Sequence, residues 1–246
     1  MVAGCGGTGS YVAEGLGRIL PGYIQIVLVD FDRVEERNLV RQNFYPEDLG
    51  KYKAVALAER LSRKFDRPIS YCTLTVGEIY IPQTSILIGC VDNGIARRQI
   101  SERVKNLECW WVDAGNGTNY AQVLIGNNSL AKFVTRTRLA ENAEFNTTTE
   151  IAESLPYPSI QRPEILLQAP EPATPNCIDI DSQGPTINQV VAALTIEVVN
   201  RLIQGTCPWM QLMVDMDKGT MQPVMADPKI LKNMFKKKIK IIEEEN

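Results

Sequence analysis

Short apolar runs alternate with segments of helical spacing over the first 113 residues. The helical segments carry apolar residues three and four positions apart, which predicts helices at 10–20, 53–65 and 93–106. The runs between them predict strands at 1–4, 24–30, 69–75, 86–91 and 110–113. Strands that alternate with helices in this way favour a mainly parallel sheet.

The second half is patterned differently. A segment at 120–125 begins a region richer in strands, which would run antiparallel, and 212–214 and 221–224 flank Asp217-Lys218-Gly219 as a predicted hairpin. Residues 135–176 look irregular, and the proline-rich 156–175 predicts a mobile loop. The segment 185–203 is apolar nearly all round, so it predicts a buried helix.

Together these patterns predict an α/β protein with a Rossmann-like fold. Its mixed sheet would be parallel in the N-terminal half and antiparallel in the C-terminal half. We expect one domain over 1–228, made of a nucleotide-binding half at 1–113 and a β-rich half at 114–228. A charged tail follows at 229–246, where three lysines precede three glutamates.

Composition excludes several classes of protein. The chain of 246 residues is 44% hydrophobic, enough to bury a sizeable core. Its net charge of -3 gives no basic surface for general nucleic-acid binding. No apolar run approaches the ~20 residues that span a bilayer. With no transport signal, we expect a cytoplasmic protein whose cysteines are reduced.

A glycine loop follows the first predicted strand. Gly4, Gly6, Gly7 and Gly9 fit the pattern G-x-G-x-x-G, in which backbone N–H groups approach phosphate at the start of a helix. Asp30 ends the second strand, where a carboxylate can accept ribose hydroxyl groups. The loop alone could also be a glycine turn without a ligand, or could bind NAD.

The polar residues after the second strand favour ATP. Arg41 and Lys53 could stabilise the charge that develops on an α-phosphate and on departing pyrophosphate, whereas a dehydrogenase has no obvious use for them. Asn38 and Gln42 could hold the nucleotide by neutral hydrogen bonds. The alternative for the two cations is a solvated basic surface.

Asp92 follows the apolar run 86–91, at the edge where open α/β sheets hold their ligands. Mg²⁺ typically takes one or two carboxylates together with phosphate oxygens and water, so Asp92 is a candidate magnesium ligand. Asp92 could equally be the N-cap of the helix that begins near Asn93, and the two roles are compatible.

Cysteine spacing argues against a zinc site. None of the six cysteines forms a C-x-x-C pair, and the chain has no histidine. Cys177 stands apart because it follows the proline-rich stretch and precedes the predicted helix 185–203, where a thiol can have a lowered pKa. The alternative is an inert loop cysteine, since Asp179 and Asp181 oppose thiolate formation.

Several motifs, in this order, resemble the ThiF/MoeB-type ubiquitin-activating-enzyme superfamily over roughly residues 1–225. They are the loop Gly4 to Gly9, Asp30-Phe31-Asp32-Arg33-Val34-Glu35, Asn38-Leu39-Val40-Arg41-Gln42, Leu49-Gly50-Lys51-Tyr52-Lys53-Ala54, and Gly89-Cys90-Val91-Asp92-Asn93 with Arg97-Arg98. Further similarity at Asp113-Ala114-Gly115-Asn116, Asn176-Cys177 and Ile187-Asn188-Gln189 most resembles ThiF family proteins of the bacterial PRTRC system.

The resemblance implies an adenylyltransferase that activates a C-terminal carboxylate with ATP and Mg²⁺. The substrate would be a ubiquitin-like or sulfur-carrier protein with a Gly-Gly-type C-terminus, and the enzyme would be a homodimer. Asp30 would hold the ribose, and Asp32 would lie beside the reacting phosphates. Contacts to nucleotide, phosphates and magnesium would come from Asn38, Arg41, Gln42, Lys53, Asp92 and Asn93.

Relatives place a thioester- or persulfide-forming cysteine at the position of Cys177, so an acyl group could pass to it. Three other functions stay open. The chain could be a catalytically silent, nucleotide-binding partner subunit, an NAD-dependent oxidoreductase, or an enzyme that adenylates a tRNA-linked carboxylate.

Overall fold

The computed structural model describes residues 1–129, 137–142, 147–167 and 186–234. Its main sheet contains β1 (Val2–Ala3), β2 (Ile26–Val29), β3 (Ile69–Cys72), β4 (Ile86–Gly89), β5 (Trp110–Asn116), β6 (Tyr120–Gly126), β9 (Trp209–Asp215) and β10 (Thr220–Met225). The strand order is β10-β9-β6-β5-β4-β1-β2-β3. Strands β1 to β5 pair in parallel, and β6, β9 and β10 pair antiparallel, which confirms the predicted mixed sheet.

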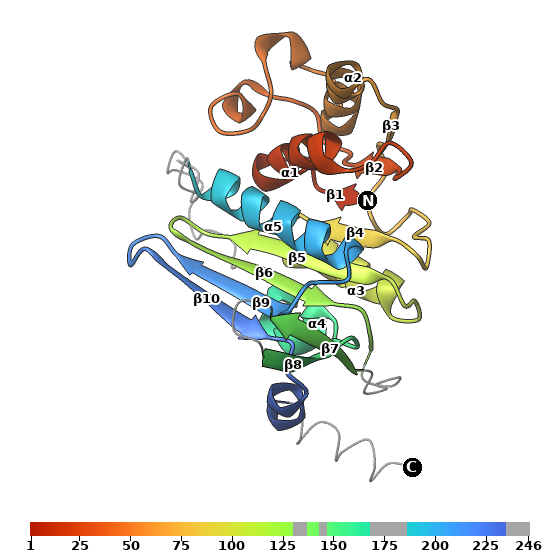
Figure 1. Ribbon diagram of the computed structural model, residues 1–246. Helices are drawn as coiled ribbons and strands as arrows, with labels where there is room; N and C mark the ends of the chain where they lie inside the picture. Colours follow the sequence, from red (N-terminus) through yellow and green to blue (C-terminus); the bar gives the residue numbers. More distant parts are fainter. Residues whose placement is uncertain (130–136, 143–146, 168–185, 235–246) are drawn as a thin grey trace.

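Helices cover both faces of this sheet (Figure 1). The helices are α1 (Gly7–Ile19), α2 (Lys53–Phe65), α3 (Gly94–Val104), α4 (Pro158–Gln161) and α5 (Ile187–Ile203), with short 3₁₀ turns η1 (Glu36–Asn38), η2 (Pro46–Asp48) and η4 (Pro163–Leu166). Because successive strand residues point to opposite faces of the sheet, each strand contributes side chains to two hydrophobic cores, one on each face. Val2, Leu28 and Val112 pack with α1, α2 and α5, whereas Ala3 and Trp111 pack on the face of α3.

Local patterns predicted the parallel half well. The helix expected at 53–65 is α2, and the expected strands 24–30 and 86–91 contain β2 and β4. Three elements differ by three residues: α1 begins earlier, at Gly7 rather than 10, β3 ends earlier, at Cys72 rather than 75, and β5 continues past the predicted end at Asp113, to Asn116. The extension of β5 is paired with β6, a partner that a local pattern does not reveal.

The prediction that 135–176 is irregular is wrong for its described part. Strands β7 (Thr137–Asn142) and β8 (Thr147–Ala152) form an antiparallel hairpin of their own. Neither strand alternates strictly between apolar and polar residues, so the hydrophobic pattern did not predict either strand. The prediction of a loop at 156–175 is likewise wrong over 156–167. Pro158 and Pro163 are the first residues of α4 and η4, and the first position of a helix suits proline.

Helix α5 packs beside α1 and across β5 and β6. The sequence predicted a helix at 185–203 buried all round, but Ala193 and Ile203 are exposed. The predicted hairpin is present as β9 and β10, followed by a helical segment at 228–234. Leu231 lies in the core, so the start of the predicted tail packs onto the domain.

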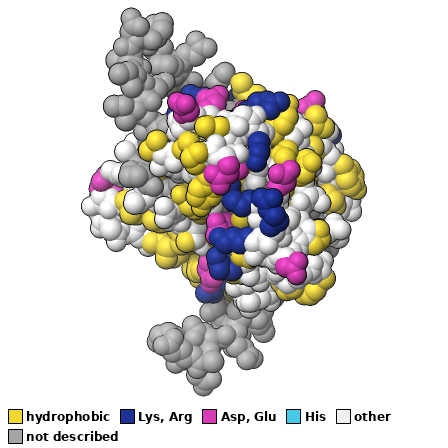
Figure 2. Space-filling model, turned by 90° about the horizontal axis from the view of Figure 1, so that it is seen from above, with side chains coloured by type: hydrophobic (Ala, Val, Ile, Leu, Met, Phe, Trp, Pro, Cys, Tyr) yellow, Lys and Arg dark blue, Asp and Glu magenta, His cyan; other side chains and the backbone are white. Residues whose placement is uncertain are grey.

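The surface carries mixed charge. Figure 2 looks down on the end of the molecule that carries α2, and basic side chains gather there in a band with acidic ones beside them. Between α1 and α2, for example, Lys64 Nζ lies 2.5 Å from Glu14 Oε1. Over the described ranges, no helix has both the length and the apolar character that a bilayer crossing requires.

Candidate functional site

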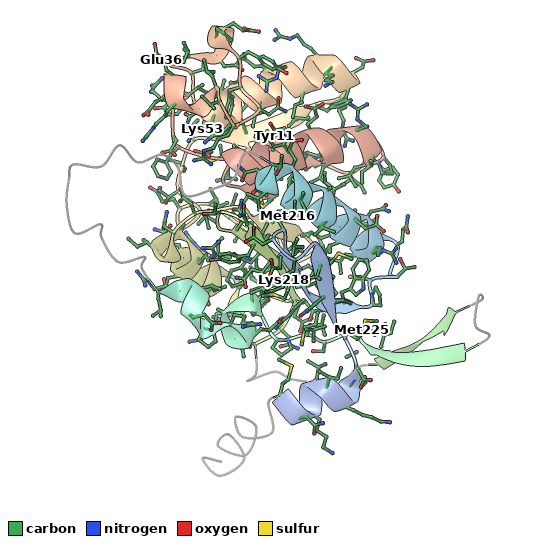
Figure 3. All side chains as sticks on the ribbon, turned by 90° about the vertical axis from the view of Figure 1, so that its left-hand side faces the viewer. Tyr11, Glu36, Lys53, Met216, Lys218 and Met225 are labelled. Atoms are coloured by element: carbon green, nitrogen blue, oxygen red, sulfur yellow. The ribbon has the colours of Figure 1, made fainter. Side chains whose placement is uncertain are left out.

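A cavity of about 200 Å³ lies at the carboxyl ends of β1, β2, β4 and β5. Open α/β sheets hold their ligands at this edge. Ten of the twelve residues predicted to bind nucleotide or metal line it: Gly4, Gly6, Gly7, Asp30, Asp32, Arg41, Gln42, Lys53, Asp92 and Asn93. Figure 3 labels Lys53 in the half that holds the cavity, and Met216, Lys218 and Met225 in the antiparallel half.

Gly9 and Asn38 are the two predicted residues outside the cavity lining. Asn38 is buried, and its Oδ1 accepts a hydrogen bond of 2.9 Å from the backbone N–H of Glu35, which closes the η1 turn. Gly9 lies inside α1. Nucleotide contact by these two residues stays a prediction.

Four helices begin at the cavity. Its walls include Gly7 from the first turn of α1, Lys53 from α2, Ala96 from α3 and Asn188 from α5. The N-terminal end of a helix carries partial positive charge and unpaired N–H groups. Four such ends around one cavity favour a polyanionic ligand such as a nucleoside triphosphate.

The glycine loop brings β1 close to its neighbours. Gly4 has φ +86°, and a Cβ atom there would lie 2.6 Å from the carbonyl oxygen of Cys90. A Cβ atom on Gly9 would lie 1.8 Å from the carbonyl oxygen of Gly4. Gly9 is therefore required for α1 to start tightly against the loop, which explains why a residue of the motif lies outside the cavity wall.

Asp30 holds the loop in place. Its Oδ2 accepts a 2.6 Å hydrogen bond from the backbone N–H of Cys5, and its Oδ1 accepts one of 2.8 Å from the N–H of Asp32. Burial raises the pKa of the Asp30 carboxyl, while these two N–H groups and Lys53 oppose the rise. Asp30 lines the cavity, and each of its carboxylate oxygens has a further lone pair that could accept a hydroxyl group.

Lys53 is a cation held at the base of the cavity. Only 8% of the residue is exposed, and its Nζ lies 3.0 Å from Asp32 Oδ2. Its backbone N–H also donates to the carbonyl oxygen of Asp32. Lys53 is the first residue of α2, and its two contacts with Asp32 hold its charge in place against the positive end of that helix.

The cap of α3 is Asn93, not Asp92. The Oδ1 of Asn93 accepts a 2.8 Å hydrogen bond from the backbone N–H of Ala96, so the expectation that Asp92 caps this helix is wrong. Asp92 is exposed at the cavity, and its Oδ1 accepts a 3.0 Å hydrogen bond from Asn93 Nδ2.

The donor set near Asp92 fits magnesium. The described ranges contain no group of three or more His, Cys, Asp or Glu residues that could hold a metal ion. A metal at Asp92 would take one or two protein carboxylates and complete its shell with phosphate oxygens and water, as Mg²⁺ usually does.

Sequence reasoning missed a buried ion pair in the cavity wall. Arg97 Nε lies 3.1 Å from both carboxylate oxygens of Asp113, which is fully buried. Burial raises the pKa of the Asp113 carboxyl, and Arg97 opposes the rise. The sequence places Arg97 one helical turn after Asn93, and it places Asp113 at the end of a predicted strand. It does not show that the two side chains meet, because their pairing depends on how α3 packs over β5.

Asn188 is a second residue that the sequence did not single out as a ligand contact. Its Oδ1 accepts hydrogen bonds from Asn116 Nδ2 at 2.9 Å and from Thr8 Oγ1 at 3.2 Å. Within the described residues, the buried atoms Asn188 Nδ2 and Gln42 Oε1 have no hydrogen-bond partner. Both residues line the cavity, so a polar ligand could supply the missing partners.

The predicted nucleophile Cys177 lies outside the described residues. The cysteines near the cavity are unsuited to that role. Burial is the main cause that raises the thiol pKa of Cys5 and of Cys90, which keeps both protonated at neutral pH.

Comparisons with known proteins identify a family and several relatives. A family model described as the ThiF family matches residues 1–237. Ubiquitin-like modifier-activating enzyme 5 of Dictyostelium discoideum is 31% identical over 140 residues, which cover 48% of this chain and 35% of that protein. The Bombyx mori protein of the same name is 31% identical over 139 residues, covering 48% and 34%. The alignment thus spans about a third of these relatives.

Solved structures share the fold. A crystal structure of E. coli MccB with succinimide aligns with a TM-score of 0.63 and 18% identity over 92% of this chain and 64% of that one. A structure of E. coli MccB with ATP gives 0.60 and 20%, again over 92% and 64%. The nearer resemblance to PRTRC-system proteins stays a prediction.

Proposed function

The chain belongs to the ThiF family, and we propose that it joins a carboxylate to AMP at the expense of ATP. The observation that carries this proposal is the composition of one cavity. Arg41, Lys53 and Asp92 meet the glycine loop there, at the start of α1. Hydride transfer leaves the phosphates of its cofactor unchanged, whereas displacement of pyrophosphate develops charge on phosphate oxygens that two cations can stabilise.

In the proposed reaction, a carboxylate oxygen of the substrate forms a bond to the α-phosphorus of ATP. The bond from that phosphorus to the bridging oxygen breaks, and pyrophosphate leaves with the electron pair. Lys53 and Arg41 stabilise the charge on the leaving pyrophosphate and the α-phosphate. N–H groups of the glycine loop hold the phosphates, and Asp30 holds the ribose. Magnesium, held by Asp92, would neutralise phosphate charge when bound.

We propose a protein or peptide C-terminus as the carboxylate. Named relatives are ubiquitin-like modifier-activating enzymes, and a structural neighbour is a crystal structure of E. coli MccB with AMPCPP and MccA. The finer expectations belong to the same proposal: a Gly-Gly-type ubiquitin-like or sulfur-carrier partner, a homodimer, and acyl transfer to Cys177. The five described cysteines are free, which supports a cytoplasmic location.

The test is exchange of labelled pyrophosphate into ATP, with synthetic peptides that end in Gly-Gly carboxylate and the same peptides ending in Gly-Gly amide. We expect magnesium-dependent exchange with the free carboxylate alone. Lys53→Ala should lower exchange by about a hundredfold or more, since it removes a fixed charge from the transition state. Lys51→Ala is the matched control, because that lysine is exposed two residues earlier. Asp92→Ala should abolish the magnesium-dependent part.

Other outcomes identify the competing functions. ATP binding without exchange for any peptide or carrier protein would favour a silent partner subunit. Exchange that depends on added tRNA would favour a tRNA-linked carboxylate. Binding of NAD with no binding of ATP would refute adenylation altogether.

A further inference from the structure

The cavity has two chemically different sides. Toward β2 it carries the cation Lys53, with Asp32 beside it. Toward β5 it carries the amides of Asn116 and Asn188, and Asp113 neutralises the Arg97 cation there. Strand order separates the two sides, because β1 and β4 lie between β2 and β5. The β2 side therefore offers an ammonium group paired with a carboxylate, and the β5 side offers neutral amide donors beside the Arg97–Asp113 pair.

The glycine loop lies between two side-chain amides. A Cβ atom on Gly6 would lie 3.8 Å from Gln42 Nε2, and one on Gly7 would lie 2.7 Å from the amide atoms of Asn188. The missing side chain of Gly7 is what lets the Asn188 amide pack flat against the loop. Asn188 is only 1% exposed, so its amide group is a built part of the wall.

In the structure the Asn188 amide directs its oxygen at two donors. Its oxygen accepts from Asn116 Nδ2 and from Thr8 Oγ1, so its nitrogen is left as the donor. Among the described residues this nitrogen has no partner. A buried donor without a partner costs free energy, which a ligand oxygen would recover.

Displacement at phosphorus places the attacking group opposite the leaving group. If Lys53 and Arg41 stabilise the charge of the departing pyrophosphate, the carboxylate must approach from the β5 side of the cavity, where Asn188 lies. A neutral donor suits that position. The carboxylate loses its negative charge as the acyl–phosphate bond forms, so a cation would stabilise the ground state more than the transition state.

We propose that Asn188 Nδ2 binds the substrate carboxylate and positions it for attack; this rests on the function proposed above. Asn188 donates to the oxygen that does not attack and that becomes the carbonyl oxygen of the acyl-adenylate. Asn116 and Thr8 hold the Asn188 amide in place, and thus act as positioning residues.

The experiment compares two ligands by calorimetry, so it needs no natural substrate. AMP probes the nucleotide half of the site, and 5′-O-(N-glycylsulfamoyl)adenosine adds an acyl group whose carbonyl oxygen stands in for the carboxylate oxygen. We expect wild type to bind the acyl compound at least tenfold more tightly than AMP. Asn188→Ala should reduce that preference by about tenfold or more, with AMP affinity within twofold of wild type.

Three further variants separate binding from folding. Asn188→Asp keeps an oxygen that can accept from Asn116 and Thr8, but it replaces the donor nitrogen by a second oxygen. This variant should keep the fold and lose the preference for the acyl compound over AMP. Gln189→Ala removes an exposed amide on the same helix and should keep the preference. Thr8→Val loosens the support of Asn188, so it should weaken the preference less than Asn188→Asp.

Each contrary result has a distinct meaning. A preference for the acyl compound that survives in both Asn188 variants would refute this role while leaving adenylation intact. An equal loss of affinity for AMP and for the acyl compound would mean that Asn188 only stabilises the glycine loop, and it would also refute the proposal. Failure of wild type to bind AMP, ATP and the acyl compound would refute the proposed function itself.

Discussion

Removing Asp113 tests how the cavity wall is stabilised. In wild type, Arg97 Nε lies 3.1 Å from both Asp113 oxygens, and the two side chains are 11% and 0% exposed. Asp113→Ala would leave the Arg97 cation without its partner in a largely buried place. Breaking a buried pair from one side costs about 3–5 kcal/mol. Because Arg97 lines the cavity, water can reach it, so we expect the lower end, ~3 kcal/mol.

Thermal and urea unfolding measure this cost. For a chain of this size, ~3 kcal/mol corresponds to a fall in melting temperature of about 6–12 °C. Asp215→Ala is the control, since its partner Lys218 is largely exposed and we expect little change. The double variant Arg97→Met/Asp113→Leu removes both charges and should lose much less than the sum of the single variants. Additive losses, or an Asp113→Ala cost under ~1 kcal/mol, would contradict the buried-pair account.

The same pair predicts a pH dependence. Because burial raises the folded-state pKa of Asp113 above its ordinary value of 3.8, the protonated form is favoured in the folded state. Its contribution to the free energy of unfolding is therefore fully present below that ordinary value, and is lost as pH rises through the raised pKa. Asp113→Asn should flatten this decline in the free energy of unfolding with rising pH, which urea titrations at several pH values would measure. An unchanged decline would mean that other groups cause it.

Three further predictions concern the cavity and the residues that pack around it. Asn93→Ala should lower the free energy of unfolding by about 1 kcal/mol through loss of the α3 cap, measured by urea titration. Gly9→Ala should cost about 1–3 kcal/mol or more, because its Cβ would collide with the Gly4 carbonyl oxygen, and it should also weaken ATP binding. Cys5 and Cys90 should resist iodoacetamide at pH 8 in the folded protein, since burial raises their pKa. Mass spectrometry would report this, and rapid labelling of Cys90 would contradict it.

Much of the nucleotide half was readable from local sequence. Turns, strand ends and helix starts depend on residues close in the chain, so the glycine loop, Asp30 and the α2 start at Lys53 were all predicted at their observed positions. Parallel strands bring their carboxyl ends to one edge, and for that reason Asp30 and Asp92 were expected at one site.

The sequence by itself determined the elements of the parallel half, the hairpin of β9 and β10, and the polar residues at strand ends. Only the tertiary structure decided that Asn188 meets Thr8, 180 residues earlier, and that Asp113 pairs with Arg97. It also decided that β7 pairs with β8 without a periodic pattern. The physical reason is that periodicity and capping act over a few residues, whereas these contacts form only when α5 packs on α1 and α3 packs over β5, so no local pattern contains them.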